Sequence, residues 1–228
     1  MLIPLRGISS MATRAVLAEL AVAYERQTTC PVRIESVGGV DAAKRVQAGE
    51  TFDVVLLAAE AIDKLLASGH ATGARVDLFR SEVAVAVQAG AATPDIGSED
   101  ALKAAVLAAP TIGYSTGPSG TALLKLFERW GIAAEMQART VQAPPGVPVG
   151  SLVADGKVAL GFQQSSELKD LAGITVLGAL PDPVRITTIF SGAVCATSQQ
   201  AHAAQDLLAF LASPASTDIK RRHGMEPA

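Results

Sequence analysis

The sequence predicts an α/β fold, in which crossover helices connect the strands of a sheet, rather than a helical bundle or a β-sandwich. Three observations predict this class. Short apolar runs alternate along the chain with longer stretches whose apolar residues follow a helical period. Serine and glycine residues repeatedly stand between a short run and the next helical stretch, as in strand-to-helix turns. Of the 228 residues, 49% are hydrophobic, which suffices for one large domain or two small ones.

The first 70 residues predict three pairs of a strand and a helix. The strands are short apolar runs, expected at 2–7, 32–37 and 52–58. The helices are expected at 10–24, 40–47 and 59–68. Ser9 or Ser10 would cap the first helix, and Gly49 and Gly69 would close the other two. The apolar side chains of the first helix share one face: Val16, Leu17, Leu20, Ala21 and Tyr24.

The rest of the chain continues the same alternation without an internal repeat. The run "SEVAVAVQA" alternates cleanly, with valine at every second position of its centre, and is expected to be a strand. Further strands are expected at 111–115, 136–143, 158–163, 174–180 and 186–197. Helices are expected at 95–108, 121–130, 147–154, 165–172, 200–211 and 214–223. This order is typical of two connected α/β halves.

Composition narrows the function classes. Nineteen basic and 22 acidic residues give a net charge of -3 without a basic run, so nucleic acid is not the expected partner. Aromatic residues make up 4%, too few for a base-stacking platform or an aromatic cage. A polar, small ligand is therefore expected, and no cofactor.

Several other classes are disfavoured by motifs and their spacing. Cys30 and Cys195 lie far apart and predict no disulfide framework, and the three histidines, His70, His202 and His223, lack the spacing of metal ligands. No apolar stretch approaches the length of a membrane span. The first residues show no export signal, so the expected location is cytoplasmic, or periplasmic if a leader has been removed.

Four predicted strand-to-helix turns share small or hydroxyl residues. A helix start offers unpaired N–H groups and the positive end of its dipole, and serine adds a hydroxyl donor. Such turns meet at the carboxyl ends of strands in an open α/β sheet, where ligands bind. Together they predict a site for an anion, although each serine alone could simply cap its helix. The turns contain Ser9-Ser10, Gly38-Gly39, Ser119-Gly120 and Gly146.

Motifs along nearly the whole chain resemble the family of periplasmic molybdate-binding proteins. They are "GISSM", "VGGVDAAKRVQAGETFDVVLLA", "GPSGTALLKLFERWGI", "LVADGKVALGFQQSSEL" and "FLASPASTDIKRRHGMEPA". The resemblance implies a two-lobed type II periplasmic-binding-protein fold, with one domain of 1–80 plus 190–228 and a second of 81–189. The strands "SEVAVAVQA" and "ITTIFSGAVCAT" would be the hinge, with a ligand cleft between the domains.

The resemblance also implies which residues hold an oxyanion. Serine hydroxyls, N–H groups at helix starts and a tyrosine do so in the family. The tyrosine position falls on Gln164, and "VGGV" has no serine, so two family donors are replaced here. The matching positions are Ser9 or Ser10, Gly39, Val40, Ser119, Gly146, Val147 and Gln164.

Arg6 is a further departure from the family. An arginine can bind a planar carboxylate with two hydrogen bonds, so Arg6 favours an organic anion over a tetrahedral oxyanion. The alternative is that Arg6 lies on the solvent face of its strand. Two functions follow: a solute-binding protein for a small anion, with a transporter partner only if exported, or an isomerase of unsaturated tricarboxylates, as in the aconitate-type relatives of this family. For the isomerase, Tyr114, Lys44 and a serine of the first turn are candidate acid-base groups, and the residues do not decide among them.

A serine hydrolase is a third hypothesis, because "GYSTG" matches the G-x-S-x-G nucleophile elbow. The elbow requires a helix to begin at the serine. Gly117 and Pro118 instead delay the expected helix start, and no glycine-rich oxyanion motif follows an early strand. His202 and His223 are the downstream histidines that could act as a base.

Overall fold

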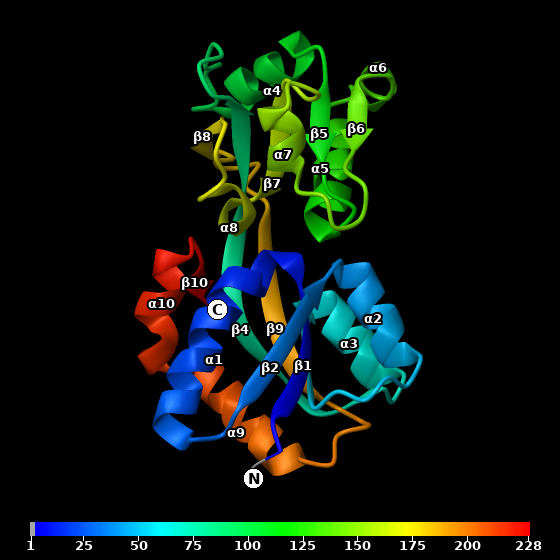
Figure 1. The fold of residues 1–228 in the computed structure, drawn as a ribbon. Helices are drawn as coiled ribbons and strands as arrows, with labels where there is room; N and C mark the ends of the chain where they lie inside the picture. Colours follow the sequence, from blue (N-terminus) through cyan, green and yellow to red (C-terminus); the bar gives the residue numbers. More distant parts are fainter. Residues whose placement is uncertain (1–2) are drawn as a thin grey trace. The chain divides into compact units, whose positions relative to one another are not determined.

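The computed structural model describes residues 3–228, and its contacts divide the chain into two compact units. Unit 1 comprises Met1–Ser81 and Ile189–Ala228, and unit 2 comprises Glu82–Thr188. Two long strands pass from one unit to the other, β4 (Ala71–Gln88) and β9 (Thr187–Cys195). Figure 1 shows the chain in sequence colours, with β4 in green-cyan and β9 in orange.

Unit 1 is built on a mixed sheet in the order β2-β1-β3-β9-β4, with β10 paired to β4. The first three strands are parallel, so their carboxyl ends lie at one edge of the sheet. β9 runs antiparallel to β3, and β10 runs antiparallel to β4. The strands introduced here are β1 (Leu5–Ser10), β2 (Val32–Val37), β3 (Val54–Ala58) and β10 (Glu226–Pro227).

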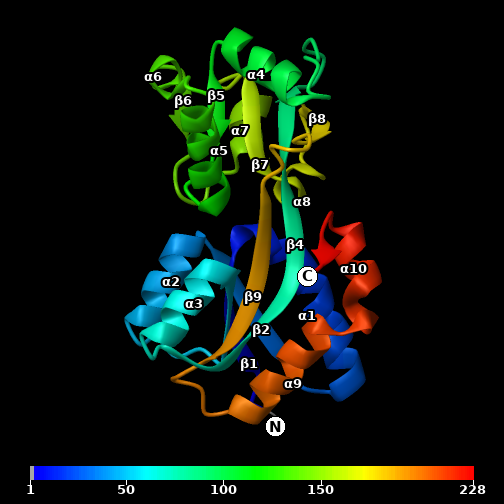
Figure 2. The ribbon, with the colours of Figure 1, turned by 180° about the vertical axis from the view of Figure 1, so that it is seen from behind.

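Helices cover both faces of this sheet, which explains its nearly continuous apolar strands. In Figures 1 and 2, α1, α9 and α10 lie on one side of the sheet and α2 and α3 on the other. Leu17, Leu56 and Leu207 belong to the core under α1 and α9, whereas Ile8, Leu57 and Ile62 belong to the core under α2 and α3. The helices are α1 (Arg14–Thr28), α2 (Gly39–Gln47), α3 (Ala59–Ala67), α9 (Ala201–Ala212) and α10 (Thr217–Arg222), with 3-10 turns at Met11–Thr13 and Pro214–Ser216.

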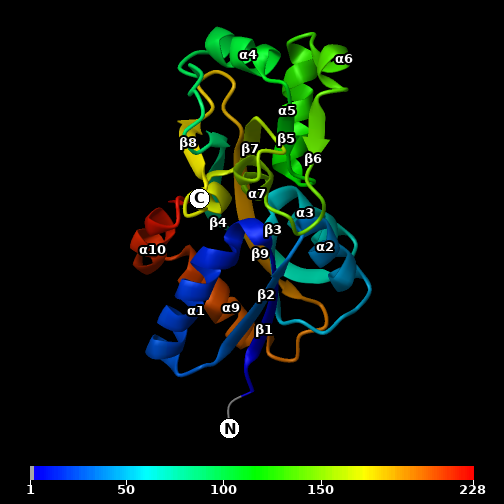
Figure 3. The same cartoon turned by 45° about the horizontal axis from the view of Figure 1, so that its top comes forward.

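Unit 2 has a second sheet, in which β5 lies between β6 and β7 and is parallel to both. Figure 3 shows these three strands side by side. The unit 2 part of β4 pairs antiparallel with β7 and with β8. The strands are β5 (Ile112–Tyr114), β6 (Thr140–Gln142), β7 (Leu160–Gln164) and β8 (Ile174–Ala179).

Apolar cores also lie on both faces of the sheet of unit 2. The largest contains Leu102, Phe127 and Phe162, and lies under the helices before β6. Val149 and Leu168 belong to smaller cores under the helices on the other face. The helices are α4 (Glu99–Ala108), α5 (Pro118–Arg129), α6 (Ala133–Met136), α7 (Val149–Ala154) and α8 (Ser165–Leu168).

The predicted α/β class is confirmed, and the differences concern element bounds. The first strand was expected at 2–7, where residue 2 lies outside the described part, and the structure forms it at 5–10 because β2 pairs with it as far as Ser10. The first α-helix therefore begins at Arg14 instead of Ser10. The expected strand at 136–143 contains only β6, because α6 ends at Met136 and a turn follows, in which the Arg139 N–H donates to the Met136 carbonyl. The expected helix at 147–154 begins at Val149.

Candidate functional site

The carboxyl ends of β1, β2 and β3 bring together the first set of predicted residues. The parallel register aligns Ser10 with Val37 and Ser9 with both Ser36 and Leu56. Helices α2 and α3 both begin directly beyond this edge. We refer to Ser9, Ser10, Ser36 and residues 38–40 as the unit 1 edge.

Ser10 is the residue of this edge with an unused polar group. Its side chain is 8% exposed, and its Oγ is buried without a hydrogen-bond partner. It does not cap the following turn, where the Thr13 hydroxyl instead donates to the Ser10 carbonyl over 3.1 Å. A β-carbon on Gly39 would lie 3.6 Å from Ser10 Cβ, so this hydroxyl is next to the start of α2. The expectation that Ser10 merely caps a helix is wrong, because its hydroxyl makes no capping bond.

Ser9 uses its hydroxyl within the protein. It is fully buried, its Oγ lies 2.8 Å from Ser36 Oγ, and it donates to the Ser10 carbonyl over 3.3 Å. Successive residues of a strand face opposite sides of the sheet, so Ser9 and Ser10 do not point the same way. Of the two serines left open by the sequence, Ser10 is thus the available donor. Sequence reasoning missed Ser36, whose signal is a hydroxyl residue next to the end of β2.

The start of α2 supplies backbone donors to the same edge. Its N-cap residue Gly38 has no side chain to bond the first N–H groups, which by helix geometry lack partners within the helix. Val40, the second residue of α2, is 50% exposed. Asp41 is also in the first turn and its negative charge opposes an anion there. Gly39 and Val40, nearest Ser10, are therefore the relevant donors.

A second set of predicted residues lies at the carboxyl ends of β5, β6 and β7. Tyr114 is aligned with Gln142 and with Phe162. Beyond β5 the chain turns into α5, which begins at Pro118 with Gly117 as N-cap. We refer to Ser115, Ser119 and Gln164 as the unit 2 edge.

Ser119 stands in the first turn of α5 and is only 5% exposed. Its Oγ lies 2.9 Å from Ser115 Oγ. The helix approaches the end of β5 so closely that a β-carbon on Gly120 would lie 1.9 Å from the Ser115 carbonyl oxygen. Glycine at 120 is what lets the two hydroxyls and the helix start occupy one small volume.

Gln164 is the last residue of β7 and is 3% exposed. Its Nε2 donates to the Thr188 hydroxyl over 2.7 Å, while its Oε1 is buried without a partner. The two ends of an amide exchange when it is turned over, and Thr188 can donate or accept. In the turned orientation Thr188 donates to Oε1 and the amide N–H groups face the position without a partner. Gln164 can therefore present a donor in place of the family's tyrosine.

Buried side-chain atoms without a hydrogen-bond partner are few in the described residues. They are Ser10 Oγ, Ser81 Oγ and Gln164 Oε1. Because burying an unpaired polar group costs about 1–3 kcal/mol, such atoms call for a partner that the described residues do not supply, a ligand or a water. Two of the three lie at positions that the sequence predicted for ligand binding, one in each edge.

Gly146 and Val147 do not provide a helix start, which corrects the sequence prediction. The Val147 N–H already donates to the Pro144 carbonyl over 3.0 Å, in a turn where Gly146 has a φ of 78°. Pro148 is the N-cap of α7. The Gly150 N–H, in the first turn, donates to Gln163 Oε1 over 3.2 Å.

Arg6 lies away from the unit 1 edge, at the other end of its strand. It is four residues before Ser10, or roughly 13 Å along β1. Its guanidinium lies 5.6 Å from the ring centre of Phe52, which also contacts Arg45 in the last turn of α2. Arg6 is exposed. The interpretation of Arg6 as a carboxylate clamp is therefore wrong, and its alternative, a solvent-facing strand residue, is correct.

The hydrogen bonds give no support to a serine hydrolase. Ser115, the serine of "GYSTG", contacts Ser119. His70 contacts Ser68 and His223 contacts Glu19, both in unit 1, and the unit 2 sequence contains no histidine. A nucleophilic serine needs a base within hydrogen-bond reach.

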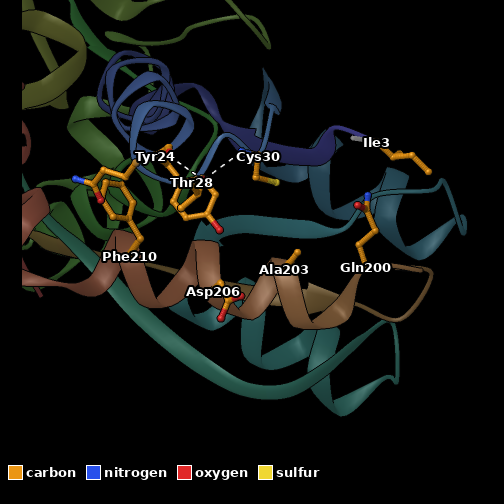
Figure 4. A pocket seen from close by; sticks show the side chains of 9 residues that line it. Ile3, Tyr24, Thr28, Cys30, Gln200, Ala203, Asp206 and Phe210 are labelled. Carbon is orange, nitrogen blue, oxygen red and sulfur yellow. Dashed lines mark hydrogen bonds between the residues drawn. The ribbon is translucent and has the colours of Figure 1, made fainter. Parts of the chain in front are cut away.

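A groove in unit 1 of about 550 Å³ lies apart from the unit 1 edge (Figure 4). Ile3 and Cys30 precede β1 and β2, so the groove opens at the amino ends of these strands. Its walls come from α1 and α9, where the rings of Tyr24 and Phe210 are 5.3 Å apart. Because α/β ligands bind at carboxyl ends, this groove is not the predicted site.

The described residues were compared with what a metal site and a membrane-spanning helix require. His, Cys, Asp and Glu side chains of residues 3–228 form no group of three or more that could hold a metal ion. None of the helices described is both long and apolar enough to cross a bilayer. Cys30 and Cys195 are free thiols.

Residues 5–226 match the family model of bacterial extracellular solute-binding proteins. The chain belongs to this family. It is 39% identical over 227 residues to an aconitate isomerase of Pseudomonas sp, a match that covers 96% of this chain and 86% of the relative. The predicted resemblance to molybdate-binding proteins and their aconitate isomerase-like relatives is confirmed.

Solved structures support the same fold. The periplasmic molybdate-binding protein of Azotobacter vinelandii superposes with a TM-score of 0.79 at 20% identity, over 97% of this chain and 98% of that chain. PEB3 with bound L-phospholactate superposes with a TM-score of 0.75 at 15% identity, over 98% and 100% of the two chains. At these identities the comparisons establish the type II periplasmic-binding fold.

Proposed function

We propose that this protein is an isomerase of unsaturated tricarboxylates that interconverts cis- and trans-aconitate. The observation that carries the proposal is its 39% identity to an aconitate isomerase over 96% of the chain, a match that leaves no part of either unit outside it large enough to hold a separate activity. The alternative is anion binding without chemistry, as the family description and the molybdate-binding structure favour. In that case a transporter would be its partner and the protein would act outside the inner membrane.

The proposed reaction moves a double bond by a 1,3-proton shift. A base takes a proton from the methylene carbon, and the electrons of that C–H bond form the new double bond. The electrons of the old double bond shift to the far carbon, which takes up a proton. Nothing is oxidised or reduced, so no cofactor is required. The intermediate carries extra negative charge, which donors fixed in advance stabilise.

We assign the binding of the ligand carboxylates to Ser10, Gly39 and Val40 in the unit 1 edge and to Ser119 and Gln164 in the unit 2 edge. The unpartnered Ser10 hydroxyl and the first N–H groups of α2 support the first assignment. The buried Ser119 and the half-paired amide of Gln164 support the second. These groups are neutral, so helix dipoles and hydrogen bonds rather than ion pairs would hold the anion.

The decisive experiment follows cis-aconitate by proton NMR with the protein in buffered heavy water. We expect trans-aconitate to form and deuterium to enter the methylene position. Thermal-shift measurements with cis-aconitate, trans-aconitate, citrate, molybdate and tungstate run in parallel. Stabilisation by molybdate or tungstate together with no conversion of aconitate would refute the isomerase and favour the binding protein.

A second experiment tests the site. In the double variant Ser10→Ala and Ser119→Ala, aconitate should stabilise the protein less, while the melting temperature without ligand stays almost unchanged, since neither hydroxyl makes a capping bond. Ser98→Ala is the matched control, because Ser98 does cap a helix by accepting from Ala101 N–H over 3.2 Å. It should lower stability by about 1 kcal/mol and leave aconitate binding intact. The reverse pattern would mark the two edge serines as structural.

A further inference from the structure

A carboxyl group next to the unit 2 edge takes no part in the binding arrangement described so far. Glu167 is the third residue of α8, which begins directly after Gln164 at the end of β7. Its side chain is only partly exposed. It accepts a hydrogen bond from Gln163 Nε2 over 2.9 Å.

A relay of hydrogen bonds fixes this carboxyl. Gln163 is 2% exposed, and its Oε1 accepts the Gly150 N–H at the start of α7. With both ends of its amide engaged, Gln163 cannot turn over without losing the bond from Gly150. Its Nε2 is therefore held toward Glu167. Two segments distant in the sequence thus determine where one carboxylate oxygen lies.

No cation neutralises Glu167 among its described neighbours. α7, β7 and β8 contain no ionisable side chain, and β4, whose Ala84 and Ala86 share a core with Leu168 of α8, carries Glu82, which pairs with Arg185 over 2.9 Å. On its own segment, Lys169 and Asp170 are exposed. A buried carboxyl without a counter-ion is rarely structural, because its charged form is costly. Burial raises the pKa of Glu167 to about 7, against the hydrogen bond from Gln163, which lowers it.

We propose that Glu167 is the proton-transfer residue of the isomerase, an inference that rests on the proposed function. Gln163 and Gln164 point to opposite faces of β7, so Glu167 approaches the strand end from the α8 side and the Gln164 amide from the other. Both groups belong to the carboxyl end of β7 and the turn into α8, so the proposal places the reacting carbons between them. The carboxylate takes the methylene proton, and the resulting carboxylic acid returns a proton to the far carbon. Gln163 is a positioning residue.

Glu167→Gln tests the proposal, with Glu128→Gln, an exposed glutamate of α5, as the matched control. We expect kcat to fall by about 10²–10⁴-fold in Glu167→Gln, and deuterium entry into aconitate to fall with it. Stabilisation by cis-aconitate should remain, since the binding donors are intact. Glu128→Gln should match the wild type in each measurement.

The outcomes separate the two proposals. If the wild type converts aconitate and Glu167→Gln keeps a kcat within threefold of it, the role of Glu167 is refuted and the isomerase stands. If the wild type neither converts aconitate nor exchanges its methylene protons, both are refuted.

Gln163→Met gives a second readout should Glu167→Gln fail to fold. Loss of the donor removes stabilisation of the carboxylate, so the apparent pKa on the acid side of the kcat profile should rise above that of the wild type. Because α7, β7 and β8 carry no ionisable side chain and Glu82 of β4 is paired with Arg185, an unchanged profile would refute the assignment.

Discussion

Replacement of Gly120 by alanine tests the local geometry of the unit 2 edge most directly. The new β-carbon would lie 1.9 Å from the Ser115 carbonyl oxygen and 2.9 Å from Tyr114 Cδ2. The Ser115 oxygen is a backbone atom, so it cannot rotate away as the end of a side chain would. Ser115 and α5 must separate by about 1.1 Å to reach a 3.0 Å contact, the lower limit for such pairs. This movement stretches the 2.9 Å contact between the hydroxyls of Ser115 and Ser119.

The expected loss is about 2–3 kcal/mol, the upper part of the range for overpacking, because a backbone segment must move. For cooperative unfolding of a chain of this size, the melting temperature falls by roughly 4–12 °C. Urea unfolding followed by circular dichroism measures the midpoint. Gly117→Ala is the control, since its φ is -86° and a β-carbon there meets nothing within 4 Å. It should cost at most about 1 kcal/mol as an N-cap change. Equal midpoints for the two variants would refute the close approach of α5 to β5.

Two further outcomes are expected. Arg6→Ala should leave the thermal stabilisation by aconitate and by molybdate equally unchanged. The lost contact with Phe52 should lower the free energy of unfolding by only about 0.5–1 kcal/mol. A selective loss of aconitate binding would restore Arg6 to the site. Burial lowers the pKa of Lys220 from its ordinary 10.5 to about 8, so the unfolded chain binds more protons between these values and stability should rise as pH goes from 8 to 10.5. Lys220→Met should flatten that rise in urea unfolding measured across the interval, and a slope as steep as in the wild type would contradict the assignment.

Patterns repeated within a few residues were enough to predict most elements. The strand 32–37 was predicted with its observed bounds, and the start of α2 within one residue, because apolar periodicity and a glycine turn are local signals. The start of α7 was predicted two residues too early. Val147 belongs to a turn, in which its N–H bonds the Pro144 carbonyl, although its sequence also fits a helix. Such a turn depends on a bond between backbone groups that no side-chain pattern reveals.

The sequence could propose donors for the candidate site but could not predict which of them the chain itself already pairs. Ser10, Ser119 and Gln164 stand out in sequence because each follows a strand. Segments distant in the sequence decide whether a hydroxyl already has a hydrogen-bond partner. The hydroxyl of Ser9 in β1, for example, is paired with that of Ser36 in β2. The prediction for Arg6 failed because its strand was expected three residues too early. With the strand at 2–7, Arg6 would stand near the strand end, whereas it is the second residue of β1.

To catalyse the proposed isomerisation, a protein that binds aconitate needs one further group, which takes a proton from one carbon and returns a proton to another. Donors at helix starts stabilise the ligand charge in either function, so they do not distinguish binder from enzyme. A carboxyl with an ordinary pKa of 4.5 is protonated only to roughly 0.3% at pH 7 and returns protons poorly, whereas one near 7 is about half protonated and serves both directions. Burial without a counter-ion produces that shift at Glu167. A lysine added to α7 by Ser151→Lys, next to the Gly150 whose N–H bonds Gln163, should lower the pKa of Glu167 and slow isomerisation at neutral pH while aconitate binding persists.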